Sequence, residues 1–277
     1  MRFDIWRWLL YKEDTILSML EVLASARHLY GLTTMRWRRK GDAIIAEHRK
    51  DTVGKDVVIV LNGPSINRQP LERLKGHDLV FVNQGFRHPA YKDLQPKYHV
   101  IIDSKLIHGI WDVKWLDEIH QMVPGITFVL PASWARLPLL NPYIEKGYPI
   151  IWTGGCIGGL RGIGVSGECF NLVRKLGYAR IYFTGFEATS FPSGLLRMAS
   201  HFYGNDADPF YGNDANGKSR NLDDVIDKAY YMNARQYHEL VLMARKFERE
   251  HVDVCNLTEG GILEMFPRKK FEDVFPA

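Results

Sequence analysis

The chain has few cysteines and no long apolar run. Its three cysteines, Cys156, Cys169 and Cys255, lie far apart and form no C-x-x-C pair, so the sequence favours neither a disulfide framework nor a zinc site. A membrane-spanning helix requires about 18 uninterrupted apolar residues, and no such stretch occurs in the sequence. Charged residues among the first seven positions interrupt the apolar segment that a signal peptide would have. We therefore expect a reduced, cytoplasmic setting.

Several motifs of nucleotide and metal sites are also missing. The chain has no G-x-G-x-x-G turn of a dinucleotide-binding fold and no G-K-[ST] ending of a P-loop. His238-Glu239 lacks the second histidine of H-E-x-x-H, which argues against a zinc protease. No D-x-D element directly follows a candidate strand, which argues against a metal-dependent transferase of nucleotide sugars.

The net positive charge lies entirely in the N-terminal segment. The 277 residues carry a net charge of +4, and residues 1–50 alone hold ten Lys and Arg against six Asp and Glu. The rest of the chain holds 26 charges of each sign. A basic groove for nucleic acid on the main body of the protein is therefore not expected.

The N-terminal segment has the pattern of a helix followed by a basic cluster. Apolar residues recur at steps of three, four and seven over residues 4–30; Asp4 can cap this helix and Gly31 can end it. The basic stretch TMRWRRKGD follows, with Trp37 embedded in it. This combination is typical of a helix that lies on a membrane surface. The alternative is a helix packed on the domain or on a neighbouring subunit, with the basic run solvated.

From residue 56 onward, short apolar runs alternate with helical patterns. The candidate strands are residues 56–61, 78–82, 98–102, 126–130, 149–152, 180–184 and 252–256. Several are continuous apolar runs, as strands covered on both faces should be. The candidate helices lie near 67–75, 112–122, 167–176 and 223–250. This alternation predicts an α/β fold with a doubly wound, mostly parallel sheet over residues 51–277, to which residues 1–50 add a helical appendage.

The end of the first candidate strand is the most informative point of the sequence. In VVIVLNGPSI, residues 57–66, a buried run stops at Asn-Gly-Pro-Ser, where the backbone must turn sharply. Ligands of open α/β sheets bind at the carboxyl ends of the strands. This turn therefore predicts a nucleotide site.

A second candidate element precedes the helix near 167–176. Ser166 can cap this helix, and a helix N-terminus attracts anions. The stretch from 154 to 164 is rich in glycine, which indicates either a flexible loop or a close approach of backbone to ligand. Arg161 in this stretch could pair with a phosphate or with an acceptor carboxylate.

Residues 185–221 break the alternation of strands and helices. They are rich in Gly, Asp, Asn, Ser and Pro, and YGNDA occurs twice. A segment this long without regular structure, inside a compact domain, is typical of a lid over an active site. Asp206, Asp208 and Asp214 could bind a divalent cation, although Asp and Asn beside Gly more often form turns.

Four segments resemble bacterial sialyltransferases that use CMP-sialic acid, and their wider relatives. Those relatives include MptE-like pterin pyrophosphokinases and proteins of polysaccharide gene clusters. The segments are LNGPS at 61–65, FVNQ at 81–84, SGECFNLVRKLGYARIYFTGFE at 166–187 and SHFYG at 200–204. The resemblance spans residues 56–257 and implies a Rossmann-like sheet, a GT-A-like variant. The C-terminal NLTEGGILEMFPR resembles the polysaccharide-cluster proteins more than the sialyltransferases.

Carried over by position, the resemblance implies a nucleotide-binding set. Its members are Asn62, Gly63, Pro64, Ser65, Asn83, Asp103, Ser166, Gly167 and Glu187. The turn at Asn62 would hold the phosphate and ribose, and Asn83 would contact the sugar or phosphate. Glu187 would bind the nucleoside, because a carboxylate accepts two hydrogen bonds from a ribose diol or a base amino group. Asp103 stands near an asparagine of the sialyltransferases and places an acid there instead.

The resemblance also implies a catalytic histidine, and we expect it to be His201. An inverting transfer needs a base for the acceptor hydroxyl, and an imidazole with a pKa of about 6.5 suits neutral pH. The family motif has two histidines, whereas this chain keeps the first and has Asn205 near the second. Tyr203 and Tyr211 would donate hydroxyls to the leaving phosphate, as a reaction without a metal ion requires.

These patterns together predict a glycosyltransferase of the sialyltransferase-like kind. It would move a CMP-activated acidic sugar, such as sialic acid, to a surface polysaccharide or a lipid-linked glycan, without a metal or other cofactor. We expect it at the inner face of the membrane, bound through its N-terminal helix, with self-association left open.

Two alternatives remain at this point. A pterin pyrophosphokinase that uses ATP and Mg²⁺ would need clustered aspartates near the nucleotide turn, where only Asp103 is well placed. A nucleotide-binding scaffold without catalysis would keep its function when His201 is replaced.

Overall fold

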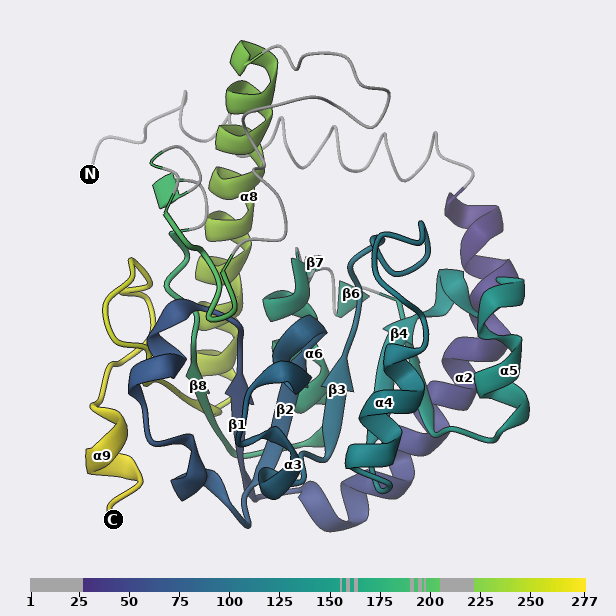
Figure 1. The fold of residues 1–277 in the computed structure, drawn as a ribbon, viewed down its shortest axis with the longest axis horizontal. Coiled ribbons are helices and arrows are strands. Elements are labelled where there is room, and N and C mark those ends of the chain that lie inside the picture. The colour runs from purple at the N-terminus through teal and green to yellow at the C-terminus, as the bar shows by residue number, and fades with distance from the viewer. Residues whose placement is uncertain are drawn as a thin grey trace.

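The main feature of the protein is a seven-stranded sheet in which every neighbouring pair of strands is parallel (Figure 1). The computed structural model describes residues 27–154, 156–157, 160–161, 164–189, 192–193, 196, 198–204 and 222–277. The doubly wound α/β fold predicted from the sequence is confirmed, and this sheet is parallel throughout.

All seven predicted strands are present, with bounds within two residues of the prediction. They are β1 (Asp56–Val60), β2 (Asp78–Val82), β3 (Tyr98–Val100), β4 (Thr127–Pro131), β5 (Ile150–Thr153), β8 (Arg180–Thr184) and β9 (Asp253–Asn256). In register, Ile59 of β1 lies beside Val80 of β2 and Phe183 of β8. All three side chains are fully buried, as continuous apolar runs predict for a sheet covered on both faces.

The order of the strands places a switch point beside β1. Across the sheet the order is β5-β4-β3-β2-β1-β8-β9. The chain thus builds outward from β1 to β5, then returns and adds β8 and β9 on the other side of β1. Such a reversal leaves a crevice at the carboxyl ends of the two strands that flank it, here β1 and β8, and open α/β sheets bind their ligands there.

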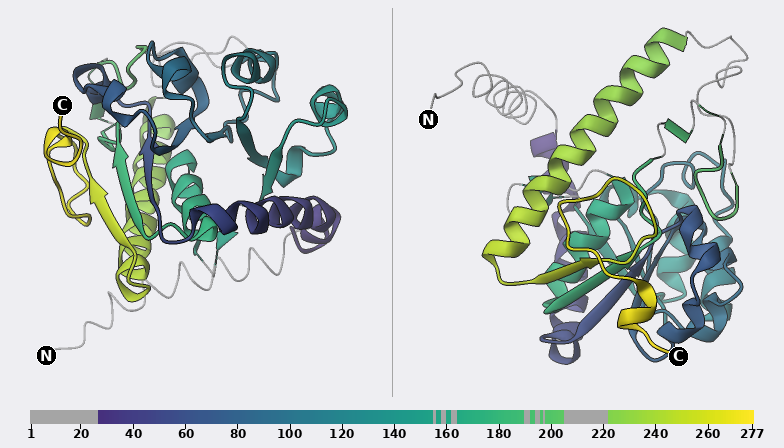
Figure 2. Two further views of the ribbon diagram at one scale, coloured as in Figure 1. Left: turned by 90° about the horizontal axis from the view of Figure 1, so that it is seen from below. Right: turned by 90° about the vertical axis from the view of Figure 1, so that its left-hand side faces the viewer.

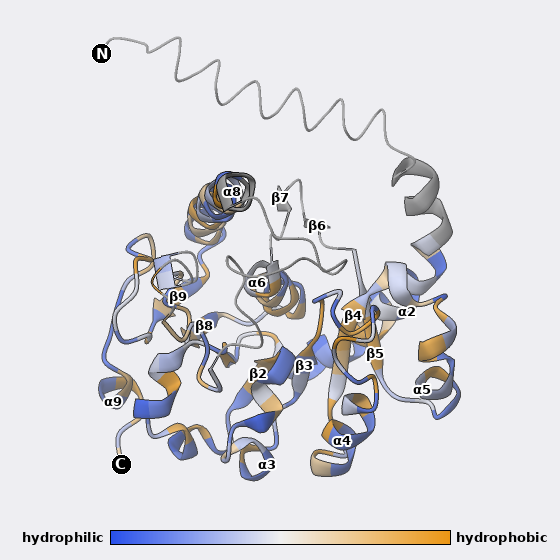
Figure 3. Cartoon of the chain, turned by 45° about the horizontal axis from the view of Figure 1, so that its top comes forward, coloured by the Kyte–Doolittle hydropathy of each residue, from blue (hydrophilic) through white to orange (hydrophobic). Residues whose placement is uncertain are grey.

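Hydrophobic cores fill both faces of the sheet. Figure 2 shows the helices that cover these faces. On one face lie the helices α2 (Arg27–Thr52), α6 (Gly164–Leu176) and α8 (Leu222–Arg249). On the other lie the shorter α3 (Tyr91–Leu94), α4 (Trp115–Met122), α5 (Asn141–Glu145) and α9 (Phe271–Val274). Figure 3 shows hydrophobic residues along the strands between these two helical layers.

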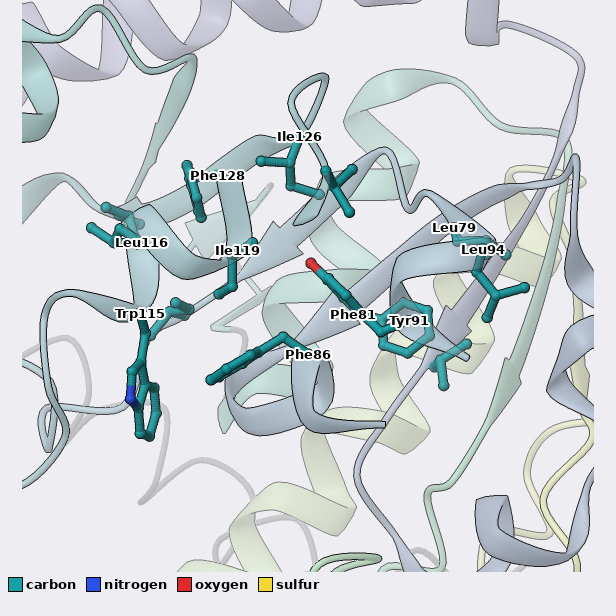
Figure 4. Close-up of a cluster of buried hydrophobic side chains, with 14 of the residues drawn as sticks. Leu79, Phe81, Phe86, Tyr91, Leu94, Trp115, Leu116, Ile119, Ile126 and Phe128 are labelled. Atoms are coloured by element: carbon teal, nitrogen blue, oxygen red, sulfur yellow. The ribbon is translucent and has the colours of Figure 1, made fainter. Parts of the chain in front are cut away.

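The core under the short helices is rich in aromatic side chains (Figure 4). Phe86 packs against Trp115 with ring centroids 5.3 Å apart, and Phe81 meets Tyr91 edge-on at 5.0 Å. Large rings bury much apolar area for each ordered residue. Four-residue helices such as α3 can therefore be held here by packing and need little helix propensity of their own.

The predicted helix over 67–75 is wrong. This stretch contains the end of one 3₁₀ helix, η1 (Pro64–Arg68), and a second one, η2 (Leu71–Leu74). Between them Gln69 is extended, with φ −98° and ψ 138°. Pro70 explains the break, because proline lacks an N–H and disfavours helical backbone in the residue before it.

The other predicted helices are present with shifted ends. α4 begins three residues later than predicted and α6 three residues earlier. In α8, Leu240, Met243 and Phe247 are buried at steps of three and four, as the amphipathic pattern predicts. The glycine-rich stretch before α6 contains a short antiparallel pair, β6 (Cys156–Ile157) and β7 (Leu160–Arg161). The remaining short elements are the 3₁₀ helices η3 (Asn83–Arg87), η4 (Ala132–Trp134) and η5 (Pro138–Leu140).

Helix α2 covers the edge strand β5. It continues through Gly31, so the predicted helix end there is wrong. Trp37 is buried and packs edge-on against Trp152 of β5. A Cβ on Gly41 would lie 2.7 Å from the backbone N of Trp152, so only glycine lets the helix come this close. This part of the protein follows the alternative of a helix packed on the domain, and it shields an edge that could otherwise pair with another chain.

The remainder of the N-terminal prediction concerns residues 4–26, which lie outside the described part of the chain. Within the described part, no helix is long and apolar enough to cross a membrane.

Glu168 in α6 is a buried carboxyl group. Its side chain is 4% exposed and accepts a hydrogen bond from the Thr153 hydroxyl. Burial raises the pKa of Glu168, while the Thr153 bond and the charge of Lys175 oppose that rise. The ionised form is thus disfavoured in the folded protein.

Replacing Glu168 by glutamine should stabilise the protein at high pH. When an acid has a higher pKa in the folded state than in the unfolded state, the free energy of unfolding falls as the pH rises from the unfolded-state pKa to the folded-state pKa. The loss persists at all higher pH values. Glu168→Gln keeps an acceptor for Thr153, so we expect a higher Tm than wild type at pH 8 and a smaller difference at pH 4. Glu118→Gln, an exposed site on α4, is the control and should show no such pH dependence. An equal shift at both pH values would contradict the assignment.

Candidate functional site

A cavity of about 220 Å³ lies at the switch point of the sheet. Its described wall is formed by the loops after β1, β2 and β8, the first turn of α6, one side chain of α8 and the segment around His201; the residues are Leu61, Asn62, Gly63, Val82, Asn83, Val165, Ser166, Gly185, Phe186, Glu187, Ala188, Thr189, Ser200, His201 and Gln236. This is the crevice that the strand order predicts for a ligand.

A larger hollow of about 460 Å³ lies between α2 and α5, with Arg36, Arg136 and Glu145 in its wall. It is at the β5 edge of the sheet, away from the switch point. We therefore place the candidate site in the smaller cavity, where the ends of three strands converge.

The turn after β1 is held in place by the segment after β8. Gly63 N donates to Gly185 O at 2.8 Å, and Ser65 N donates to Glu187 Oε1 at 2.8 Å. A Cβ on Gly63 would lie 1.6 Å from Glu187 Oε2, so glycine is required at this position. Glu187 thus lines the cavity as predicted, but one of its oxygens is already engaged in holding the turn.

Two buried amide oxygens in the cavity wall have no hydrogen-bond partner. They belong to Asn62 and Asn83, and both residues were predicted to contact the ligand. The Asn62 side chain is fixed by its Nδ2, which donates to Val82 O at 3.2 Å. A buried polar atom without a partner costs about 1–3 kcal/mol, which a ligand or water that bonds to it would recover. Two residues of the cavity lining therefore carry an acceptor that no group of the described protein satisfies.

Asn83 has an unusual backbone that a buried histidine supports. Its φ is +46°, in the left-handed region that few residues other than glycine adopt. His99 of β3 donates from Nε2 to Asn83 O at 2.8 Å, and the Tyr91 hydroxyl bonds to His99 Nδ1 at 2.9 Å. His99 is fully buried, and burial lowers its pKa to about 4, so the ring is neutral at physiological pH.

Sequence reasoning missed His99. A single histidine inside an apolar strand resembles any core residue. The register between β2 and β3 is the signal that could have identified it. His99 pairs with Phe81, which lies two residues before Asn83, so the register places His99 near the end of β2.

The segment that carries His201 is docked on the turn after β1. Phe202 N donates to Asn62 O at 2.8 Å, and Asn67 Nδ2 donates to Phe202 O at 2.9 Å. The phenylalanine between them also packs edge-on against His88. This part of the predicted lid is thus attached to the turn after β1 and to η1 by one hydrogen bond each.

His201 itself lies in the wall of the cavity. Its Nδ1 forms a hydrogen bond of 3.0 Å with the Ser200 hydroxyl. Its ring stacks on Tyr203, with centroids 5.0 Å apart and planes 11° from parallel. Tyr203, the other predicted catalytic residue, is therefore next to His201, although it is not part of the described wall.

The helix N-terminus predicted near Ser166 does reach the cavity, but Ser166 is not its cap. α6 begins at Gly164, which has φ +73°, so Ser166 lies in the first turn. Its side chain is buried, and its Oγ accepts from Gln236 Nε2 of α8 at 3.4 Å. The N–H groups of this first turn have no partner four residues back, so the helix end can still bind an anion.

Several predicted nucleotide-binding residues are not in the described wall. The Asp103 carboxylate closes its own turn by accepting from Lys105 N at 3.0 Å. Pro64 starts η1 and Gly167 is buried in α6. The side chain of Arg161 lies outside the described part, as do Tyr211 and the three aspartates of the predicted lid. Among the described residues, no three His, Cys, Asp or Glu side chains gather as metal ligands would; a reaction without metal stays a prediction.

No protein-family model and no curated protein matches this chain. Two solved structures resemble it in part. The MAf glycosyltransferase from Magnetospirillum magneticum AMB-1 is 11% identical with a TM-score of 0.47, over 84% of this chain and 38% of that one. The sialyltransferase CstII from Campylobacter jejuni, in complex with the substrate analogue cytidine-5'-monophosphate, is 17% identical with a TM-score of 0.42, over 78% of this chain and 85% of that one. At such values nothing about this chain's activity follows from either protein.

Adding a methyl group at Gly63 should disrupt the candidate site. Gly63→Ala would collide with the Glu187 carboxylate and with Gly185 O, which a Cβ would approach to 2.5 Å. We expect a loss of about 1–3 kcal/mol in the free energy of unfolding, measured by urea denaturation. Gly125→Ala is the matched control, because a Cβ there meets nothing within 4 Å and its φ is not positive. If both variants are equally stable, the close contact between the turn and Glu187 is not real.

Proposed function

We propose that this protein is a glycosyltransferase that moves an acidic sugar from a CMP-activated donor to a glycan acceptor, with inversion. The observation that carries the proposal is the position of His201 in the wall of the switch-point cavity, on a segment docked to the nucleotide turn. A general base must meet the acceptor hydroxyl beside the bound donor. The hydrogen bond between Phe202 and Asn62 fixes these two parts relative to each other.

The proposed reaction uses His201 as the base. The acceptor oxygen attacks the anomeric carbon, the bond from that carbon to the phosphate oxygen breaks, and its electron pair leaves with the CMP. His201 takes the hydroxyl proton at Nε2, in the tautomer whose Nδ1–H donates to Ser200 Oγ. Tyr203 orients the ring by stacking on it and would place its hydroxyl toward the leaving phosphate.

The charge of the wall supports a donor with one phosphate. The described lining contains Glu187 but no Lys or Arg. The positive end of α6 supplies about half an elementary charge, which suits the single phosphodiester of a CMP-sugar. A nucleoside triphosphate normally needs Mg²⁺ and a lysine or arginine at its phosphates. The resemblance of LNGPS and the segment 166–187 to CMP-sialic-acid enzymes supports the same donor class.

The proposed acceptor is a surface polysaccharide or lipid-linked glycan at the inner face of the membrane. Exposed cationic residues of α2, Arg36, Arg39 and Lys40, support contact with an anionic membrane surface. The N-terminal helix predicted before them would add the apolar contact.

Binding of CMP should stabilise the fold more than other nucleotides do. A ligand at 100 times its Kd adds about 2.7 kcal/mol to the free energy of unfolding, which a thermal-shift assay detects. CMP, UDP, GDP and ATP are compared with and without Mg²⁺. Stabilisation by ATP with Mg²⁺ alone would contradict the transferase and favour the pyrophosphokinase, and stabilisation by UDP alone would contradict the CMP donor.

Replacing His201 should abolish transfer but not binding. We expect His201→Asn to lower kcat by about 10²- to 10⁴-fold, because it removes the base, and to leave the Kd for CMP within threefold. His251→Asn is the control. His251 is exposed and lies just before the amino end of β9, whereas the cavity lies at the carboxyl ends of the strands. Its φ of 55° is one that asparagine tolerates. Full transfer by His201→Asn would exclude His201 as the base.

A further inference from the structure

A buried hydrogen-bonded chain leads from the aromatic core to the cavity wall. The Tyr91 hydroxyl bonds to His99 Nδ1 at 2.9 Å, and His99 Nε2 bonds to Asn83 O at 2.8 Å. Tyr91 and His99 are both fully buried, and Figure 4 shows Tyr91 within the core beside Phe81 and Phe86. Asn83, at the other end, lines the cavity, and its buried Oδ1 has no hydrogen-bond partner.

The direction of every bond in this chain follows from its last acceptor. A carbonyl oxygen can only accept, so His99 Nε2 must carry the proton. Nδ1 then has a lone pair and accepts from the Tyr91 hydroxyl. Burial lowers the pKa of His99 to about 4, so the neutral ring with this single tautomer is the form present at physiological pH.

Packing alone does not account for a histidine at this position. Its neighbours include the rings of Phe86 and Tyr91. A phenylalanine would fill the same space without the cost of burying two ring nitrogens. The histidine forms two hydrogen bonds that phenylalanine cannot: it accepts one from the buried Tyr91 hydroxyl and donates one to the backbone of Asn83.

Asn83 has φ +46°, in the left-handed region, which is sparsely populated although asparagine enters it more readily than most residues other than glycine. The Asn83 carbonyl is the group that His99 holds. If the peptide turned, Asn83 would leave the left-handed region and its amide would leave the wall.

We propose that His99 is a positioning residue. With Tyr91 behind it, His99 holds the backbone of Asn83 in the left-handed conformation, and this conformation turns the side-chain amide of Asn83 toward the bound donor. The inference rests on the proposed nucleotide-sugar site for what Asn83 binds. It predicts that His99 contributes to donor binding only through Asn83.

A double-mutant cycle tests this coupling. The affinity for CMP is measured by calorimetry for wild type, His99→Phe, Asn83→Gly and the double variant. Asn83→Gly removes the amide while glycine tolerates the positive φ. We expect His99→Phe to weaken CMP binding about tenfold in the wild-type background, because it removes the hydrogen bond that holds the Asn83 carbonyl, and not at all in the Asn83→Gly background.

Two further variants guard against a fold defect. Tyr91→Phe removes only the hydroxyl behind His99 and should weaken CMP binding less than His99→Phe. His99→Gln can donate to Asn83 O and should recover part of the affinity. The matched control is His48→Phe, which breaks a similar bond of 2.9 Å between His48 Nδ1 and the Tyr98 hydroxyl. Tyr98 lies at the amino end of β3, away from the cavity, so the affinity should be unchanged.

A crystal structure of ligand-free His99→Phe separates this inference from the proposed function. We expect Asn83 to have left positive φ, or its amide to have turned out of the cavity. If wild type binds no nucleotide, the proposed function fails, and this structure alone decides the positioning role. An unchanged Asn83, or an equal loss of affinity from His99→Phe with and without the Asn83 side chain, would overturn the inference.

Discussion

The parallel ladder between β1 and β8 continues past the ends of both strands, and the candidate site depends on this continuation. Leu61 N donates to Thr184 O and Gly63 N to Gly185 O, so the two loops of the switch point stay paired where they would otherwise diverge. The approach needs two glycines. A Cβ on Gly185 would lie 2.4 Å from Leu61 O, and a Cβ on Gly63 would enter the Glu187 carboxylate. Two other parts of the site are attached to this junction: Glu187 accepts from Ser65 N in the turn, and the His201 segment donates to Asn62 O through Phe202 N.

Much of the fold could be predicted because a parallel sheet covered on both faces demands continuous apolar runs, and runs such as DVVIV are rare elsewhere. The errors arose where local pattern and tertiary contact disagree. A glycine inside a helix costs about 1 kcal/mol, so Gly31 was expected to end its helix, but the packing of Trp37 and Ile45 on the body outweighs that cost. At 67–75, the leucine spacing fits a 3₁₀ turn as well as an α-helix, and Pro70 decides between them.

In the candidate site, the structure brings together predicted residues that directly follow strands, and it does not bring in those whose position depends on where a loop goes next. Asn62 and Asn83 come straight after β1 and β2, and the ends of neighbouring parallel strands must meet. Asp103 follows β3 in the same way, but its loop turns back on itself, so its carboxylate bonds to Lys105. His99 was invisible for the opposite reason: it acts from inside a strand, and no motif marks a histidine that supports a backbone.

The direction of α2 relates the basic cluster to the cavity. Trp37 and Gly41 contact Trp152 near the carboxyl end of β5, whereas His48 bonds to Tyr98 at the start of β3. The helix therefore runs opposite to the strands, and its first turns lie on the side of the sheet where the strands have their carboxyl ends, which is also the side of the cavity. Arg36 and Lys40 each place their charge 4.7 Å from the Trp37 ring, which leaves these cations partly held by the protein and still exposed. Packing on the domain and contact with an anionic surface are thus compatible, because Trp37 is buried while these cations remain exposed. A surface that met these cations would lie on the side of the carboxyl ends of the strands, as His201 does.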